Sequence, residues 1–339
     1  MRARKSQNRF LTQVDTLIDW DKVRKLIEKK YTKKQNAVGT KAYDCILLFK
    51  ILLLEVWYGL SDPGVEERVN DSISFSRFLG LSAEETCPDH STISRFRTAL
   101  TDLGLIEKVF EAVNAQLRKH CVSINQGAIV DASIVPTPNK PKGSRTIEVA
   151  GDREDTRTDK EKEEEAEYQR TIEKKSPGTD PEGAWVIKRN KLEYGYKTHI
   201  ATDTKGIVLS VVTTPANETD VKHFEDVLEK ARLPKGTRVY ADKGYTSAQN
   251  RQYLKDKGLK DGIMHKARRG HPLTEEQKII NKLISKTRSC VERTFGGIHR
   301  WFSGGRCRYR GLLKTHTQNL LEALAFNLYR MPSLIVFGR

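Results

Sequence analysis

The stretch RVYADKGYTS, residues 238–247, predicts a short buried strand that ends in a carboxylate and then turns sharply. The apolar residues before Asp242 suit a strand, and Gly244 allows a tight turn after it. Open α/β sheets bind their ligands just beyond the carboxyl ends of strands, so Asp242 is a candidate site residue. The alternative is an Asp that only makes a turn or caps the next helix, because Asp is common at both positions.

A second acid interrupts the apolar run GAIVDASIV, residues 127–135, which predicts a buried strand ended by Pro136. A carboxylate inside such a strand is costly to bury unless it is paired. A hydrogen-bonded structural role for Asp131 remains open, but a metal ion explains the residue better.

Two β-rich segments, residues 191–200 and 206–213, follow with the hairpin signal DTKG between them. A helix is expected over about residues 220–231, before the strand that carries Asp242. This β-β-β-α-β order places acids on the first and fourth strands and predicts a mixed α/β domain.

The sequence RSCVERTFGGIHRW predicts part of a helix that begins near Thr274. One face of this helix is apolar and is formed by Val291, Phe295 and Ile298. Another face carries Arg288, Glu292 and His299, which fall at helical spacings. Glu292 is therefore a third candidate acid, and the alternative is an ordinary surface ion pair with Arg288.

The remainder of the chain indicates a helical N-terminal part and a charged insertion. Residues 10–117 have helical periodicity, with residues 42–60 as an apolar central helix. Residues 88–97, PDHSTISRFR, suit either a DNA-reading helix or an ordinary surface helix.

Residues 142–182 hold 9 basic and 13 acidic residues with few large apolar side chains, so they cannot form a core. A closing apolar helix over residues 312–328 is expected to pack on the sheet.

The chain carries 60 Lys and Arg against 44 Asp and Glu, a formal net charge of +16. Such an excess indicates a polyanionic partner, although mere solubility is the alternative. Five cysteines without any CxxC spacing argue against zinc sites and disulfides and for a reducing compartment. The most apolar run is too short to span a bilayer, and no signal peptide is visible.

Three carboxylates brought together repel one another unless cations lie between them. Oxygen-only ligands suit Mg²⁺ or Mn²⁺. Two such ions can stabilise the attacking and the leaving oxygen of a phosphoryl transfer. Asp131, Asp242 and Glu292 would then be the metal ligands, with the basic flanks contacting a phosphate backbone.

Several motifs occur in a fixed order along the chain: VDAS at Asp131, YGYKTHIATD, TTPANETD, ADKGY at Asp242, and RSCVERTFGGIHRWF followed by RCRYRGL. The N-terminal part adds LIDWDKV, GLSD and HSTISRFR. With this series the chain resembles the DDE transposases of bacterial insertion sequences, specifically the insertion-sequence five family and its insertion-sequence four relatives.

The resemblance implies a ribonuclease H-like mixed sheet flanked by helices and preceded by an all-helical domain. Residues 1–125 would bind DNA or form a dimer, and residues 126–339 would be catalytic, with a charged insertion at about 140–184. Asp131, Asp242 and Glu292 would be the catalytic, metal-binding acids, with two Mg²⁺ or Mn²⁺ ions. The relatives' helix signature carries tyrosine and lysine where this chain has Ser285 and His299, which leaves the DNA-end contacts open.

The implied activity is cleavage at the terminal inverted repeats of an element and joining of the 3′-hydroxyl ends to target DNA. The protein would act as a homodimer on paired ends, in the bacterial cytoplasm at the nucleoid and without a membrane. A stand-alone nuclease and a DNA-binding regulator are the alternatives, although three intact acids argue against the regulator. The residues expected to contact DNA are Arg95, Arg97, Lys243, Lys266, Arg268, Arg269, Arg288, His299, Arg300, Arg308 and Arg310.

Overall fold

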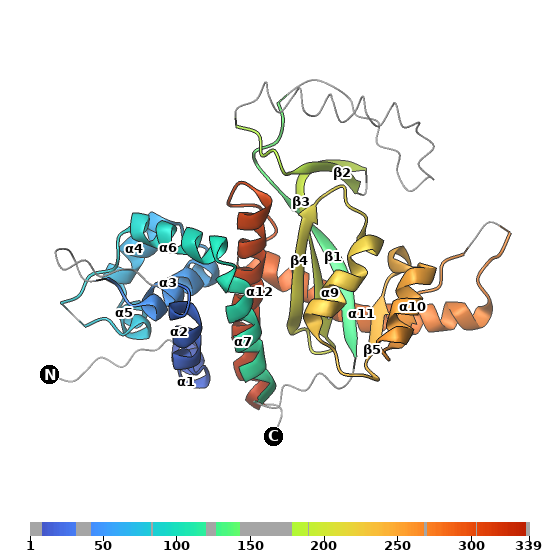
Figure 1. Cartoon of the computed structure of the whole chain (residues 1–339), viewed down its shortest axis with the longest axis horizontal. Helices are drawn as coiled ribbons and strands as arrows, with labels where there is room; N and C mark the ends of the chain where they lie inside the picture. The colour runs from blue at the N-terminus through green and yellow to red at the C-terminus, as the bar shows by residue number, and fades with distance from the viewer. Residues whose placement is uncertain are drawn as a thin grey trace.

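The computed structural model describes residues 9–31, 42–82, 84–119, 127–142, 178–188, 190–267, 270–302 and 304–336. Helices from the N-terminal part lie at one end of the molecule and a sheet with its own helices lies at the other (Figure 1). Two long helices, α7 and α12, lie side by side between them. In the described part of the chain, no helix combines the length and apolarity needed to cross a membrane.

The N-terminal part is all helical, as its periodicity predicted. Its helices are α1 (Arg9–Leu17), α2 (Trp20–Glu28), α3 (Cys45–Tyr58), α4 (Asp62–Asp71), α5 (Ile73–Leu79), α6 (His90–Asp102) and α7 (Leu105–Lys119). Helix α3 is the predicted central helix: Asp44 caps its first turn, and Gly59 ends it in the left-handed conformation at φ 65°. It is buried on nearly all sides, which explains why its sequence shows no polar face.

A six-stranded mixed sheet forms the other half. Its strands are β1 (Ala128–Pro136), β2 (Ala184–Lys188), β3 (Lys191–Asp203), β4 (Val208–Pro215), β5 (Arg238–Ala241) and β6 (Lys260–Ile263). The main order is β2-β3-β1-β5-β6, and β4 pairs with β3. Strands β1, β3 and β4 are antiparallel, whereas β1, β5 and β6 run parallel.

The helices of this half are η1 (Asp220–His223), α9 (Phe224–Ala231), η2 (Lys243–Tyr245), α10 (Ala248–Asp256), α11 (Glu275–Trp301) and α12 (Leu312–Val336). The predicted β3–β4 hairpin and the helix over residues 220–231 are confirmed. Helix α11 begins after Thr274, which forms a capping box with Gln277, so its predicted start is also confirmed. Strands β2 and β6 and helix α10 were not predicted.

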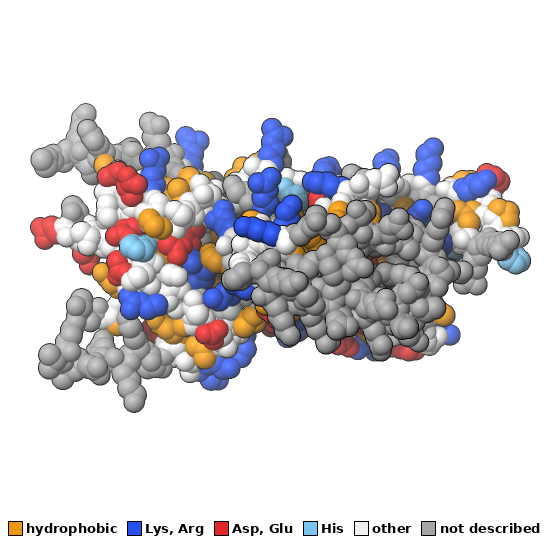
Figure 2. Space-filling model, turned by 90° about the horizontal axis from the view of Figure 1, so that it is seen from above, with side chains coloured by type: hydrophobic (Ala, Val, Ile, Leu, Met, Phe, Trp, Pro, Cys, Tyr) orange, Lys and Arg blue, Asp and Glu red, His pale blue; other side chains and the backbone are white. Residues whose placement is uncertain are grey.

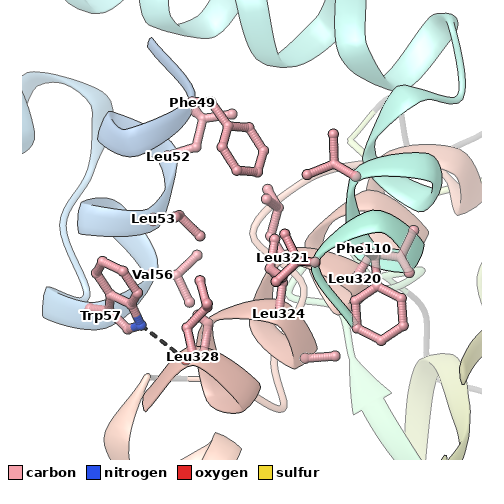
Figure 3. Close-up of a cluster of buried hydrophobic side chains, with 14 of the residues drawn as sticks. Phe49, Leu52, Leu53, Val56, Trp57, Phe110, Leu320, Leu321, Leu324 and Leu328 are labelled. Carbon is pink, nitrogen blue, oxygen red and sulfur yellow. Dashed lines mark hydrogen bonds between the residues drawn. The ribbon is translucent and has the colours of Figure 1, made fainter. Parts of the chain in front are cut away.

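The largest buried cluster joins the two ends of the molecule. Apolar side chains of α3 and α7 meet those of α12 in one continuous core (Figure 3). The indole of Trp57 donates to the carbonyl of Ala325 at 3.0 Å. Helix α12 was expected to pack on the sheet, and it does contact β4, but its other side packs against the N-terminal helices. That second contact was missed because an apolar helix does not indicate its partners.

A buried polar contact fixes α12 against the sheet. Asn327, which is fully buried, accepts from the amide of Val208 at 2.8 Å and donates to its carbonyl at 2.8 Å. Asn327 also donates to Asn114 of α7 at 2.9 Å. One side chain thus links α12, β4 and α7.

Candidate active site

Asp131 and Asp242 occupy matching positions on neighbouring parallel strands. In the β1–β5 pairing, Ile129 lies opposite Tyr240. Asp131 follows Ile129 by two residues, and Asp242 follows Tyr240 by two residues. Side chains alternate along a strand, so the two carboxylates fall on the same side of the sheet. The fold therefore brings together the two acids that the sequence placed on separate strands.

The carboxylate of Asp131 is 19% exposed and lies beside a cation. Its Oδ1 accepts from the amide of Ala132 at 2.9 Å, and its Oδ2 accepts from Nη2 of Arg288 at 3.0 Å. Burial raises the pKa of Asp131, and the negative charge of Asp242 raises it further, while Arg288 opposes both effects. Arg288 is thus the counter-ion of Asp131.

Asp242 follows β5 and caps the short helix η2. Its Oδ1 accepts from the amide of Gly244 at 2.7 Å. A Cβ at Gly244 would lie only 2.9 Å from that oxygen, so a side chain there would disturb the turn. The expected sharp turn is confirmed, and the carboxylate remains partly exposed beyond the strand.

Glu292 lies on α11, the helix that packs against β1 and β5. Its neighbour Val291 is buried together with Phe295 and Ile298, which confirms the predicted apolar face. Glu292 itself is exposed, and Arg288 pairs with Asp131 rather than with it. Within the described residues no three His, Cys, Asp or Glu side chains are arranged to hold a metal ion. The two aspartates fit an oxygen-ligand site, and Glu292 is carried by the helix that packs against their strands.

Of the basic residues expected to contact DNA, Arg95 and Arg308 line a common groove with a volume of about 1070 Å³. The groove lies between the start of α6, the α3–α4 turn and the loop before α12. Both side chains are exposed, and Arg95 donates to Ser91 Oγ at 2.7 Å. The groove is thus lined by residues of the N-terminal helices and of the loop before α12.

The structure corrects the prediction for Arg97. This side chain is 6% exposed, and its Nη2 donates to Glu55 and to Asp62, both at 2.7 Å. Tyr309 covers the guanidinium with its ring, 5.2 Å away. Arg97 therefore holds α3, α4 and α6 together and is not on a surface that DNA could reach.

The other expected contacts are distributed over the catalytic half. Lys243, Lys266, Arg300 and Arg310 have exposed side chains, whereas Arg268 and Arg269 lie outside the described residues. The ring of His299 lies close to Gly305, where a Cβ would come within 2.6 Å of it. On the face seen in Figure 2, Lys and Arg side chains gather over the middle of the molecule, while most acidic side chains lie over the N-terminal helices.

Sequence reasoning missed Lys188, whose charge lowers the pKa of Asp131. This lysine ends β2, a strand that the sequence gave no reason to separate from the charged insertion. In the β2–β3 pairing, Lys188 lies opposite Lys191, at the end of the ladder. Only the short apolar run AWVI at residues 184–187 could have indicated the strand.

Two aspartates on neighbouring parallel strands, a flanking helix and a basic surface fit a metal-assisted enzyme that acts on a phosphate polymer. Comparison with known proteins makes this specific. The family model "Transposase DDE domain" matches residues 123–328, and "Transposase domain (DUF772)" matches residues 1–99. The chain belongs to the DDE-domain transposases, enzymes that cleave DNA and transfer its strands.

One relative is the transposase for insertion sequence element IS1106 of Neisseria meningitidis serogroup B. It is 39% identical over 238 residues, which cover 70% of this chain and 76% of that protein. Among solved structures, the piggyBac transposase synaptic complex with hairpin DNA matches with a TM-score of 0.50 at 11% identity. The match covers 99% of this chain and 77% of that one, and it shows a common fold.

Proposed function

We propose that the protein binds the terminal inverted repeats of its own insertion element, hydrolyses phosphodiester bonds at the ends and joins the 3′-hydroxyls to target DNA. The observation that carries this proposal is the matched register of Asp131 and Asp242 on adjacent parallel strands. The order β4-β3-β1-β5-β6 supports a ribonuclease H-like catalytic half within residues 126–339. Residues 1–125 would contribute DNA binding and dimer contacts.

Asp131 and Asp242 would hold the divalent ions, Mg²⁺ or Mn²⁺ and two in number, and Glu292 would supply the third carboxylate. Bound ions of this kind activate the attacking water or 3′-hydroxyl and stabilise the departing oxygen. The all-oxygen ligand set supports this choice of metal. Asp131 must be ionised to act as a ligand, and Arg288 favours that state in the free protein.

Arg288 would have a second role when DNA binds. With the charge of Asp131 balanced by a bound cation, the guanidinium would be available to donate to a phosphate of the DNA. Its planar arrangement of donors matches phosphate oxygens in pairs. Arg288 would thus balance the charge of Asp131 in the free protein and position a DNA phosphate once DNA is bound.

The basic groove that contains Arg95 and Arg308 supports DNA binding by both halves of one chain. Two element ends must be processed together, so a homodimer on paired ends is the assembly we propose. Bacterial cytoplasm, at the nucleoid, is the matching location. No part of this activity requires a membrane.

The test is cleavage of DNA that carries the element's ends. Asp131→Asn, Asp242→Asn and Glu292→Gln should each abolish nicking and joining in Mg²⁺ while binding in Ca²⁺ persists, because each change removes a ligand charge and keeps the side-chain shape. Asp256→Asn, an exposed change on α10, is the matched control and should retain activity. Wild-type cleavage by any of the three variants would remove that residue from the site.

The products also separate the alternatives. Nicked DNA without joined products would indicate a stand-alone nuclease. Binding without any cleavage by the wild-type protein would indicate a regulator.

A further inference from the structure

Helix α11 has a third face, which neither packs in the core nor carries Glu292. With the β3–β4 turn and α12, this face lines a groove with a volume of about 710 Å³. Among its described lining residues, four side chains are basic and none is acidic. The basic side chains are Lys205, Arg293, Arg300 and Arg330.

Hydrogen bonds from α11 fix the turn that forms one wall of this groove. The thiol of Cys290 donates to the carbonyl of Thr204 at 3.2 Å, and the hydroxyl of Thr294 donates to the carbonyl of Gly206 at 3.1 Å. Gly206 has φ +87°, and a Cβ there would lie 2.8 Å from Thr294 Oγ1. The close approach of turn and helix therefore requires glycine.

Opposite the turn, the groove has an apolar wall with open space beside it. Trp301 is 46% exposed and stacks on Phe326, with the ring centroids 6.2 Å apart. A Cβ at Gly297 would lie 2.7 Å from Phe326, so α11 packs directly on that ring. A Cβ at Gly296 would meet nothing within 4 Å. A ligand can enter at Gly296 without displacing any side chain there.

Among the residues that the structure describes, none forms an ion pair with any of these four basic side chains. Asp203, two residues before Lys205, is 1% exposed, and its Oδ1 accepts from the amides of Lys205 and Ile207. Glu292, next to Arg293, is exposed but does not line the groove. Arg330 donates to the carbonyl of Lys205 at 3.2 Å, which anchors it at the groove's edge. The groove thus offers concentrated positive charge to a ligand.

The groove is near the candidate active site but separate from it. In the β1–β3 pairing, Asp203 lies opposite Ala128, three residues before Asp131. At about 3.3 Å per residue, the turn is roughly 10 Å from Asp131 along the sheet. Arg293 follows Glu292 directly and projects from α11 about 100° further around the helix.

We propose that this groove binds the phosphodiester backbone of DNA a few nucleotides from the reacting phosphate. Arg293 and Arg300 are seven residues apart on one helical stripe, about 10 Å along the axis. That separation spans about three nucleotide steps of a duplex strand at roughly 3.4 Å each. Guanidinium groups bind phosphate oxygens in pairs, and the apolar wall at Trp301 suits the sugar edge. The identity of the ligand rests on the proposed function.

The experiment measures binding of a fluorescein-labelled duplex of about 30 base pairs and arbitrary sequence, in Ca²⁺, at several salt concentrations. Backbone contacts do not read sequence, so no element end is needed. The triple variant Arg293→Ala, Arg300→Ala, Arg330→Ala should flatten the slope of log K against log salt by about 0.9 for each lost contact. The matched control, Lys235→Ala, Lys255→Ala, Lys260→Ala, removes the same charge at exposed positions elsewhere and should keep the wild-type slope.

Gly296 provides a second test that removes no basic side chain. Gly296→Glu places a negative charge in open space and should weaken duplex binding at least about tenfold, whereas Gly296→Ala should bind as the wild type does. Thermal unfolding verifies that each variant is folded. An unchanged slope in the triple variant, or stabilisation by inorganic phosphate without any effect on DNA binding, would overturn the proposal. Binding in Ca²⁺ needs no chemistry, so failure of wild-type cleavage would contradict only the proposed function.

Discussion

At the residue scale, His299 is the side chain through which we expect pH to affect DNA binding. It lies two turns after Glu292 on α11. Partial burial lowers its pKa below the ordinary histidine range, so the free protein holds it neutral near pH 7. A DNA phosphate beside the ring would favour the protonated form and raise that pKa.

We predict that DNA binding in Ca²⁺ strengthens as the pH falls from about 8 toward 6, because binding then takes up a proton at His299. His299→Lys stays charged throughout this range and should bind with little pH dependence. Titrations of a labelled duplex at each pH make the comparison. If both proteins respond to pH in parallel, Arg300 makes the phosphate contact, and His299 only packs near Gly305.

At the scale of elements, the hydrogen bonds of Asn327 between α12, β4 and α7 should contribute measurably to the free energy of unfolding. Asn327→Leu leaves the amide of Val208 buried without its partner, and Asn114 loses a donor. Each unpaired buried group costs about 1–3 kcal/mol, so urea unfolding should show a loss of that order. Lys314→Ala, an exposed change on the same helix, should stay within about 0.5 kcal/mol. A loss no larger than the control's would mean that the sheet and helix rearrange around the site.

Elements with a strong local signal were predictable from the sequence. The capped helix α3, the β3–β4 hairpin and the apolar face of α11 each follow from residues within one segment. Strand β6 was missed because KDGI offers neither alternation nor an apolar run, and its place depends on pairing with β5. Sequence thus locates elements better than it locates their partners.

For the candidate site too, some features could be predicted from the local sequence and others could not. The two aspartates were predictable because Asp131 interrupts an apolar strand and Asp242 directly follows one. The burial of Arg97 was not, since its partners Glu55 and Asp62 are 42 and 35 residues away in the chain. In the local sequence HSTISRFR, this arginine cannot be distinguished from the exposed Arg95. Ion pairs between distant segments are a property of the fold.

At the scale of the whole molecule, ionisation of Glu322 makes the stability of the folded protein depend on pH. It lies on α12 at a small cavity shared with Glu55 of α3 and Tyr309. Gln318 donates to its carboxyl group at 2.7 Å, and burial raises its pKa from 4.5 to about 7. The folded state therefore keeps a proton that the unfolded chain releases at lower pH.

The stabilising effect of this proton is full below about pH 4.5 and is lost as the pH rises through 7. We predict that Glu322→Gln, which cannot ionise, gains stability relative to the wild type between pH 5 and pH 8, by up to about 3 kcal/mol. Chemical unfolding of both proteins at the two pH values gives this difference. A constant difference would place the pKa of Glu322 at its ordinary value.

The shared core also determines when the N-terminal helices can fold during synthesis. The apolar surfaces of α3 and α7 are covered by α12, which the ribosome makes about two hundred residues later. Until then those surfaces remain exposed to chaperones and to other nascent chains. A polypeptide released early would carry α6 without the helix that completes the core around its neighbours. Premature termination should therefore yield aggregated or degraded fragments rather than a shortened protein that occupies the element's ends.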